Sequence, residues 1–153
     1  MKKLGIWVEI TTLIVPSLND SDEELREIAS FIKSIGPEIP WHVSRFYPNY
    51  RMRTGQPTSI EKLYRAREIG LEEGLQYIYI GNAPGEYEDT YCHSCGKLLI
   101  QRSCYRVIRS EIEIDANAAK CPNCEAKIHG VWDYLTTERT PSNQQAASTM
   151  TRS

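Results

Sequence analysis

Four cysteines in the second half of this 153-residue chain have the types and spacing of a metal site. They form two CxxC pairs separated by 25 residues. Each CxxC turn presents two sulfurs, and two such turns can close a tetrahedral four-thiolate site around zinc. A single iron would fit the same donor geometry. The spacing therefore predicts a metal site, with zinc favoured over iron, made by Cys92, Cys95, Cys121 and Cys124.

The other interpretations of these cysteines are two disulfides, a redox dithiol or chance spacing. The start of the chain contains no signal-peptide core, because Glu9 interrupts a short apolar stretch. We therefore expect a soluble cytoplasmic protein, in which thiols stay reduced unless a metal holds them. The fifth cysteine, Cys104, lies at no ligand spacing and is expected to be a packing or free thiol. His93 and His129 could be spare ligands, but surface positions are favoured for both.

The region around the cysteines is predicted to be a small zinc-ribbon-like module over residues 86–135. Strand-like stretches at 98–102 and 105–114 could form the ribbon. So short a module has little core of its own, and its folding should depend on the metal. Residues 136–153 are rich in Thr, Ser, Gln and Ala, which predicts a disordered tail.

The overall composition excludes several classes of protein. The chain is 41% hydrophobic and 25% charged, as in ordinary globular domains. Its net charge of −2 gives no support to a general polyanion-binding role, so nucleic acid is not expected as a partner. No apolar run approaches the ~18 residues that a membrane span requires.

The first half of the chain alternates predicted strands and helices. Strands are expected over 6–15, 41–47 and 76–80, where β-branched and aromatic residues cluster before Pro or Gly. A helix is expected over 21–35, because Ser21 precedes Glu24 at capping-box spacing and apolar residues recur at helical intervals. A second helix should begin near 58–59 and end at Gly74. The predicted order is βαβαβ.

This order implies a parallel sheet with right-handed crossovers. If the strands lie side by side in chain order, that handedness puts both helices on one face and leaves the other face bare. Parallel sheets are normally covered on both faces, and a three-stranded unit also has two unprotected edges. The segment is therefore predicted to be part of a larger sheet or barrel.

A resemblance to a known family agrees with this interpretation. Over roughly residues 3–133, the chain resembles the C-terminal part of the AmmeMemoRadiSam-system radical SAM proteins, which are relatives of the pyruvate formate-lyase activating enzymes. The segments that carry the resemblance occur in the family's order: VEITTLIVPSLNDSDEEL, WHVSRFYPNYRM, RAREIGLEEGLQYIYIGNAPGEYEDTYCHSCGKLLIQRS and CPNC…GVW.

The resemblance implies an α/β fold in which residues 1–85 form the βαβαβ segment of a partial (β/α) barrel, followed by the zinc-ribbon-like module. In the complete family protein, a [4Fe–4S] cluster binds S-adenosylmethionine and cleaves it to a 5′-deoxyadenosyl radical. The family holds that cluster with CxxxCxxC, and this chain contains no such motif. We therefore expect a truncated product, one half of a split protein or a fragment, unable to cleave S-adenosylmethionine alone.

Polar residues on the predicted strands are candidates for cofactor binding. In the first strand, the side that carries Glu9 and Thr11 is the more polar one, and we assign it to the barrel interior. Others lie on the same side of the second strand or near the carboxyl ends of the strands, where barrel chemistry is located. The candidates are Glu9, Thr11, His42, Ser44, Arg45, Tyr50 and Asn82. The alternative is structural: His42 would be a hydrogen-bonded core residue and Arg45 would pair with a helix carboxylate. None is assigned a catalytic role.

Two functions from different classes remain open. The first is the C-terminal section of a radical SAM, activase-like enzyme, whose partners would be a separate N-terminal half and a Memo-like or Amme-type protein. The second is a stand-alone zinc-ribbon interaction module that retains a βαβαβ remnant.

Overall fold

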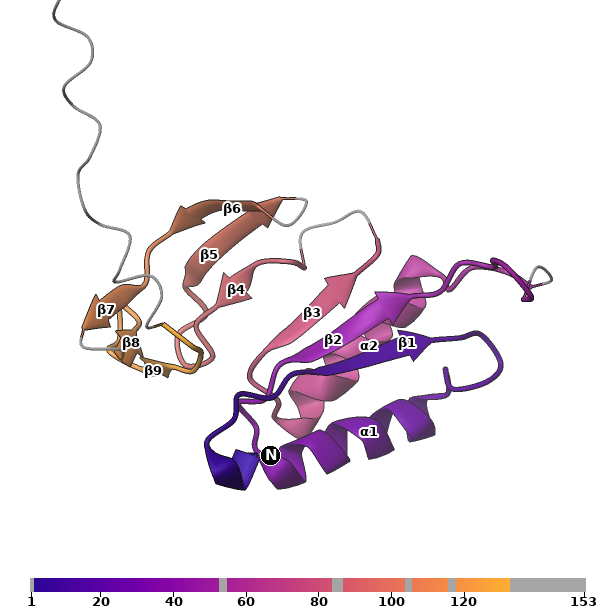
Figure 1. Cartoon of the computed structure of the whole chain (residues 1–153), viewed down its shortest axis with the longest axis horizontal. Helices are drawn as coiled ribbons and strands as arrows, with labels where there is room; N and C mark the ends of the chain where they lie inside the picture. The colour runs from indigo at the N-terminus through magenta and orange to yellow at the C-terminus, as the bar shows by residue number, and fades with distance from the viewer. Residues whose placement is uncertain (1, 53–54, 84–86, 104–105, 116–117, 133–153) are drawn as a thin grey trace, which may run out of the picture.

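The computed structural model describes residues 2–52, 55–83, 87–103, 106–115 and 118–132. Cys104 and the predicted tail over 136–153 lie outside the described residues. Within the described part, the chain forms an α/β unit followed by a β-rich module (Figure 1).

The α/β unit confirms the predicted βαβαβ order. A short 3-10 helix, η1, covers Lys2–Leu4, and the main elements are β1 (Ile10–Ile14), α1 (Asp22–Ile35), β2 (Trp41–Arg45), α2 (Ile60–Glu73) and β3 (Ile78–Gly81). The three strands pair in parallel in the order β1-β2-β3. Figure 1 shows α1 and α2 on the same face of this sheet. In this part of the chain, therefore, one sheet face has no helix against it.

The strand boundaries differ from the prediction because pairing decides them. β1 begins at Ile10 rather than residue 6, since Ile10 pairs with Trp41, the first residue of β2. β3 extends to Gly81, which pairs with Ser44. β2 ends at Arg45 rather than residue 47. β-Branched composition identified the strands, but only the neighbouring strand determines where each one starts and stops.

The helix boundaries follow local signals and lie close to the prediction. Ser21 caps α1 with the complete capping box, in which its side chain accepts from the Glu24 amide. Ser59 caps α2 in the same way through the Lys62 amide. Gly74 ends α2 in a left-handed conformation with φ of 94°.

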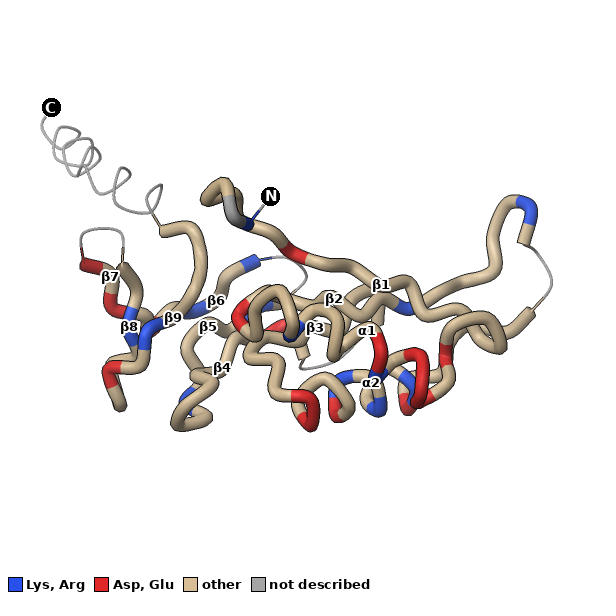
Figure 2. The backbone as a smooth tube through the Cα atoms, turned by 90° about the horizontal axis from the view of Figure 1, so that it is seen from below, with Lys and Arg blue, Asp and Glu red and all other residues tan. Residues whose placement is uncertain are grey.

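The core of the α/β unit lies between the helices and one face of the sheet. Trp41 is fully buried there, and its indole Nε1 donates to Thr12 Oγ1 at 2.9 Å. Gly70 of α2 permits the close approach, because a Cβ at that position would lie 2.7 Å from Ile78 Cδ1 and 3.1 Å from the Trp41 ring. The solvent side of the helices is charged instead (Figure 2).

Ion pairs join the two helices side by side. Arg26 of α1 contacts Glu72 and Glu73 of α2 at 2.9 and 2.8 Å. Arg65 of α2 contacts Asp22 of α1 at 2.8 Å, and this hydrogen bond lowers the pKa of the Asp22 carboxyl. The charges along the helices therefore pair with each other.

The second half contains two small antiparallel sheets. The first comprises β4 (Thr90–Tyr91), β5 (Leu98–Ser103) and β6 (Arg106–Ser110), and the second comprises β7 (Glu113–Asp115), β8 (Ala118–Lys120) and β9 (Lys127–Ile128). The predicted strand over 105–114 is thus divided between two sheets. No helix in the described residues is long and apolar enough to cross a membrane.

Candidate metal centre

The four predicted cysteines converge in the structure. Their sulfur atoms all lie within 4.8 Å of one another. Cys92 Sγ is 3.6 Å from Cys124 Sγ, and Cys95 Sγ is 3.7 Å from Cys121 Sγ. Four thiolates around a tetrahedral zinc, with Zn–S bonds of about 2.3 Å, would lie about 3.8 Å apart. The four cysteines are free, so the donor set and its spacing suit a metal ion such as zinc rather than two disulfides.

Each CxxC pair forms the turn of a β-hairpin. The first turn joins β4 to β5, and the second joins β8 to β9. In the first turn, the Cys92 amide donates to the Lys97 carbonyl at 2.8 Å and the Gly96 amide donates to the Cys92 carbonyl at 2.9 Å. In the second, Cys121 and Glu125 make the equivalent bonds, to Ala126 and Cys121, at 2.9 Å each. These hydrogen bonds close both turns and bring the two cysteines of each pair to one side of the hairpin end.

The two turns differ at the residue that follows the second cysteine. This residue is left-handed in both turns, with φ of 71° at Gly96 and 58° at Glu125. A non-glycine residue costs about 1 kcal/mol or more in this conformation. The second turn therefore carries backbone strain at Glu125, which the first turn avoids because Gly96 occupies the equivalent position.

Replacing Glu125 with glycine is expected to strengthen metal binding about fivefold, which corresponds to about 1 kcal/mol of relieved strain. Gly96→Ala should weaken binding by a similar factor, because it introduces the same strain into the first turn. Zinc affinity measured by chelator competition provides the test. Glu125→Ala, which removes the charge but keeps the strain, should resemble the unchanged chain; a gain equal to that of glycine would contradict the explanation.

The environment of the sulfurs is asymmetric. Cys92 and Cys121 are buried, whereas Cys95 and Cys124 are exposed. Burial raises the pKa of the Cys92 thiol to about 11, while hydrogen bonds from the Lys97 backbone and the Asn123 side chain lower the pKa of Cys95 to about 6. Metal coordination requires thiolates, so a bound cation would compensate the buried charge at Cys92.

A cleft of about 660 Å³ lies between the free face of the parallel sheet and the metal module. This volume falls within the range of ligand pockets, about 300–1,000 Å³. The α/β unit contributes one side and the module the other. Lining residues from the two sides include Trp7, Glu9, His42, Tyr77, Tyr79 and Asn82 from the first, and Glu88, Thr90, Arg102, Val107, His129 and Trp132 from the second.

Two of the predicted cofactor-binding residues form a pair in this cleft. His42 Nε2 lies 2.9 Å from Glu9 Oε2, and the Trp7 indole donates to Glu9 Oε1 at 2.9 Å. The His42 ring also stacks on Tyr79 with centroids 5.3 Å apart. His42 is hydrogen-bonded, but it is part of the open sheet face rather than the core. A carboxylate and an imidazole held together in a cleft can bind a polar ligand or exchange a proton with one.

The other five predicted residues are less tightly grouped. Thr11 and Ser44 belong to the same sheet face, since Thr11 pairs with His42 and Ser44 with Gly81, but they lie outside the cleft lining. Asn82 lines the cleft and donates to the Arg45 carbonyl at 2.9 Å.

Arg45 and Tyr50 lie apart from the Glu9–His42 pair. Arg45 donates to the Thr58 carbonyl at 2.7 Å and to the Tyr47 hydroxyl at 2.8 Å, so within the described residues the helix carboxylate of the structural alternative is not its hydrogen-bond partner. Tyr50 is exposed, with the Arg51 guanidinium over its ring.

Tyr77 is a contact residue that the sequence analysis missed. It is 4% exposed, its hydroxyl accepts from the His129 amide at 3.3 Å, and it lies 3.4 Å from His93 Nδ1. His129 is therefore not a simple surface residue, and its Nδ1 is buried without a hydrogen-bond partner in the part of the chain that the structure describes. Burial raises the pKa of the Tyr77 phenol to about 12, so the hydroxyl is neutral at ordinary pH.

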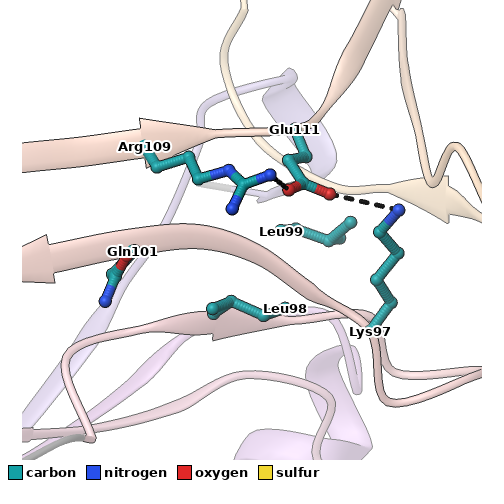
Figure 3. Close-up of a pocket in the computed structure, with 6 residues that line it drawn as sticks. All are labelled: Lys97, Leu98, Leu99, Gln101, Arg109 and Glu111. Atoms are coloured by element: carbon teal, nitrogen blue, oxygen red, sulfur yellow. Dashed lines mark ion pairs between the residues drawn. The ribbon is translucent and has the colours of Figure 1, made fainter.

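A smaller cavity, of about 260 Å³, lies on the metal module (Figure 3). Glu111 contacts Lys97 at 3.1 Å and also pairs with Arg109, and these three side chains line the cavity. The carboxylate is thus shared between two cations at an exposed site. This arrangement links Arg109 of β6 and Glu111 to the end of the first CxxC turn, and each of the three charged side chains that line the cavity is in an ion pair.

The chain is similar to one uncharacterized protein from Methanocaldococcus jannaschii, with 48% identity over 129 residues. The match covers 83% of this chain but only 38% of that protein, so the chain spans less than two fifths of its relative's length. No protein-family model matches the chain. The search of solved structures gave no match either.

Proposed function

We propose that this chain supplies the C-terminal part of a radical SAM protein: a segment that completes a larger (β/α) barrel, and a zinc module attached to it. The observation that carries the proposal is a three-stranded parallel sheet with helices on one face and the Glu9–His42 pair on the other. Parallel sheets are normally covered on both faces, so further strands and helices would enclose this polar face. The sequence resemblance assigns the same role to the segment.

The relative from Methanocaldococcus supports a larger assembly. Most of that protein lies outside the matched segment, which leaves room for the other strands and helices of a barrel. Its activity is not established, so the radical chemistry rests on the resemblance. Glu9 directly precedes β1 and His42 is the second residue of β2, so in the complete protein they would orient a polar group inside the barrel at the amino ends of its strands, not at the carboxyl ends.

The metal ions implied for such a protein fit this chain to different degrees. Four converging thiolates form a closed site, which is typical of structural zinc. A [4Fe–4S] cluster of the radical SAM type does not fit, because none of the five cysteines belongs to a CxxxCxxC motif. The zinc would hold the module together, and any cluster would come from another segment or subunit.

The experiment joins this chain to the unmatched portion of the Methanocaldococcus protein. The chain alone, reconstituted anaerobically with iron and sulfide, should give no 5′-deoxyadenosine from S-adenosylmethionine under reducing conditions. The chimera should give a [4Fe–4S] absorption and electron paramagnetic resonance signal, together with 5′-deoxyadenosine.

The control chimera carries alanine in place of the cysteines of the expected CxxxCxxC motif, and it should lose both signals. A well-folded chimera without a cluster, or cleavage by the chain alone, would contradict the proposal.

One observation favours the alternative of an interaction module. β6 is an edge strand, and its Val107 and Ile108 are 59% and 61% exposed. Exposed apolar residues on an edge strand can dock another protein. If the chimera has no radical chemistry while Val107→Ser and Ile108→Ser abolish binding to a Memo-like or Amme-type protein, the module function would replace the first proposal.

A further inference from the structure

Tyr77 contacts residues from both halves of the metal site. His93 lies inside the first CxxC turn, and His129 follows the second turn by five residues. The Tyr77 hydroxyl meets His93 Nδ1 and the His129 amide, and its ring packs edge-on against His93 with centroids 6.1 Å apart. A single buried side chain directly before β3 therefore touches both segments that the metal would bring together.

A second set of contacts repeats this connection farther along β3. The Tyr79 hydroxyl lies 3.0 Å from Thr90 Oγ1, in β4, directly before the first CxxC turn. Arg102 donates to the same Thr90 oxygen at 2.7 Å and lies 5.6 Å above the Tyr79 ring. The module is thus fixed to one strand of the sheet by two alternate tyrosines.

The width of the cleft depends on where these contacts hold the module, because the two sides of the cleft belong to different units. Glu9, His42 and Trp7 lie on the sheet side, whereas His129 and Trp132 come from the module. The module's buried core is small and includes Cys92 and Cys121 themselves. Without a metal ion the four thiols would no longer be held around one centre, and the two turns would no longer keep His93 and His129 in contact with Tyr77.

We propose that metal binding at the four cysteines closes the cleft over the Glu9–His42 pair, with Tyr77 as the positioning residue that couples the metal site to the sheet. The metal module thereby controls which ligands reach the free sheet face. The inference goes beyond the proposed radical SAM role. The inference depends on the metal site alone, so a chimera without radical chemistry would not contradict it.

The chain's three tryptophans can report on its three parts separately. Trp41 is buried in the core of the α/β unit, Trp132 packs against the core of the module on its side of the cleft, and Trp7 lies on the sheet side of the cleft. Incorporation of 5-fluorotryptophan gives one ¹⁹F resonance for each, and Trp7→Phe and Trp132→Phe assign them. The full chain is measured with one equivalent of zinc and after zinc removal by a chelator.

Zinc removal should move the Trp132 and Trp7 resonances and leave Trp41 unchanged. In zinc-loaded Tyr77→Phe, the metal and the Trp41 resonance should be retained, while the Trp7 resonance moves at least halfway toward its zinc-free position. Tyr47→Phe is the matched control, because the Tyr47 hydroxyl contacts Arg45. Its removal should leave the Trp7 resonance unchanged.

Two results would overturn the proposal. The first is a Trp7 resonance that does not respond to zinc removal, and the second is zinc-loaded Tyr77→Phe with an unchanged Trp7 resonance. If Tyr77→Phe shifts Trp41 and so disturbs the core, His93→Ala decides instead, because His93 is exposed and its replacement deletes the Tyr77 contact to the first CxxC turn while the contact to the His129 amide stays. An unmoved Trp7 in His93→Ala would then count against the coupling.

Discussion

Replacement of Cys121 with serine is expected to abolish zinc binding and unfold the metal module while the α/β unit stays folded. Cys121 is fully buried and belongs to the module's own core, with Leu99, Ala119 and Ile128. Structural zinc supplies about 10–16 kcal/mol in small zinc-dependent folds, far more than so small a core can replace. The α/β unit has a separate core built on Trp41, Leu25 and Leu63, so it should survive.

Zinc content and amide nuclear magnetic resonance spectra measure this result. One zinc per chain should fall to none, and dispersed resonances should be lost from residues 87–132 only. Cys104→Ser is the matched control, because the spacing of Cys104 predicts that it is not a ligand; this variant should keep one zinc. A metal-free Cys121→Ser chain with a fully dispersed spectrum would contradict the prediction.

Replacement of Thr58 with valine is expected to destabilise the α/β unit by about 2–3 kcal/mol, although the two side chains have nearly the same shape. Thr58 is fully buried in the loop before α2. Its hydroxyl donates to the Ile14 carbonyl at 2.5 Å and accepts from the Phe46 amide at 3.0 Å. Valine would leave both backbone groups buried without a partner at the carboxyl ends of β1 and β2.

Chemical denaturation of the α/β unit, followed by Trp41 fluorescence, provides the measurement. Thr58→Ser keeps the hydroxyl and loses only a methyl group, so it should cost less than Thr58→Val. Equal losses for the two variants would assign the effect to packing and contradict the hydrogen-bond explanation.

Local signals in the sequence were sufficient for the helices and the metal ligands. Ser21, Glu24 and Gly74 act within a few residues of the backbone groups that they satisfy, so their spacing alone places the helix ends. The CxxC pairs are local in the same sense, because each turn is closed by hydrogen bonds inside six residues. Their convergence was inferred from the chemistry of zinc, and the structure brings the four sulfurs together.

Contacts between distant segments were beyond the reach of the sequence. The position of Thr58 in the sequence indicates the start of a helix, yet its hydroxyl hydrogen-bonds backbone groups at the ends of two strands. Tyr77 reads as a strand residue, yet it meets both CxxC segments. Arg45 was predicted to bind a cofactor, with a helix carboxylate as the alternative partner, but it donates to the Thr58 carbonyl in the loop before α2 and to the Tyr47 hydroxyl. In each case the partner is chosen by tertiary packing, which no local spacing encodes.

The four-cysteine donor set, the βαβαβ order and the sheet face without helices can be predicted from the sequence, because periodicity, caps and crossover handedness are local or general properties of chains. The pairing of Glu9 with His42, the contacts of Tyr77 with the module and the cleft between the two units depend on tertiary packing. The physical reason is that a cleft needs two surfaces at a defined separation, and that separation is set by side-chain contacts between segments more than fifty residues apart, such as Tyr77 and His129.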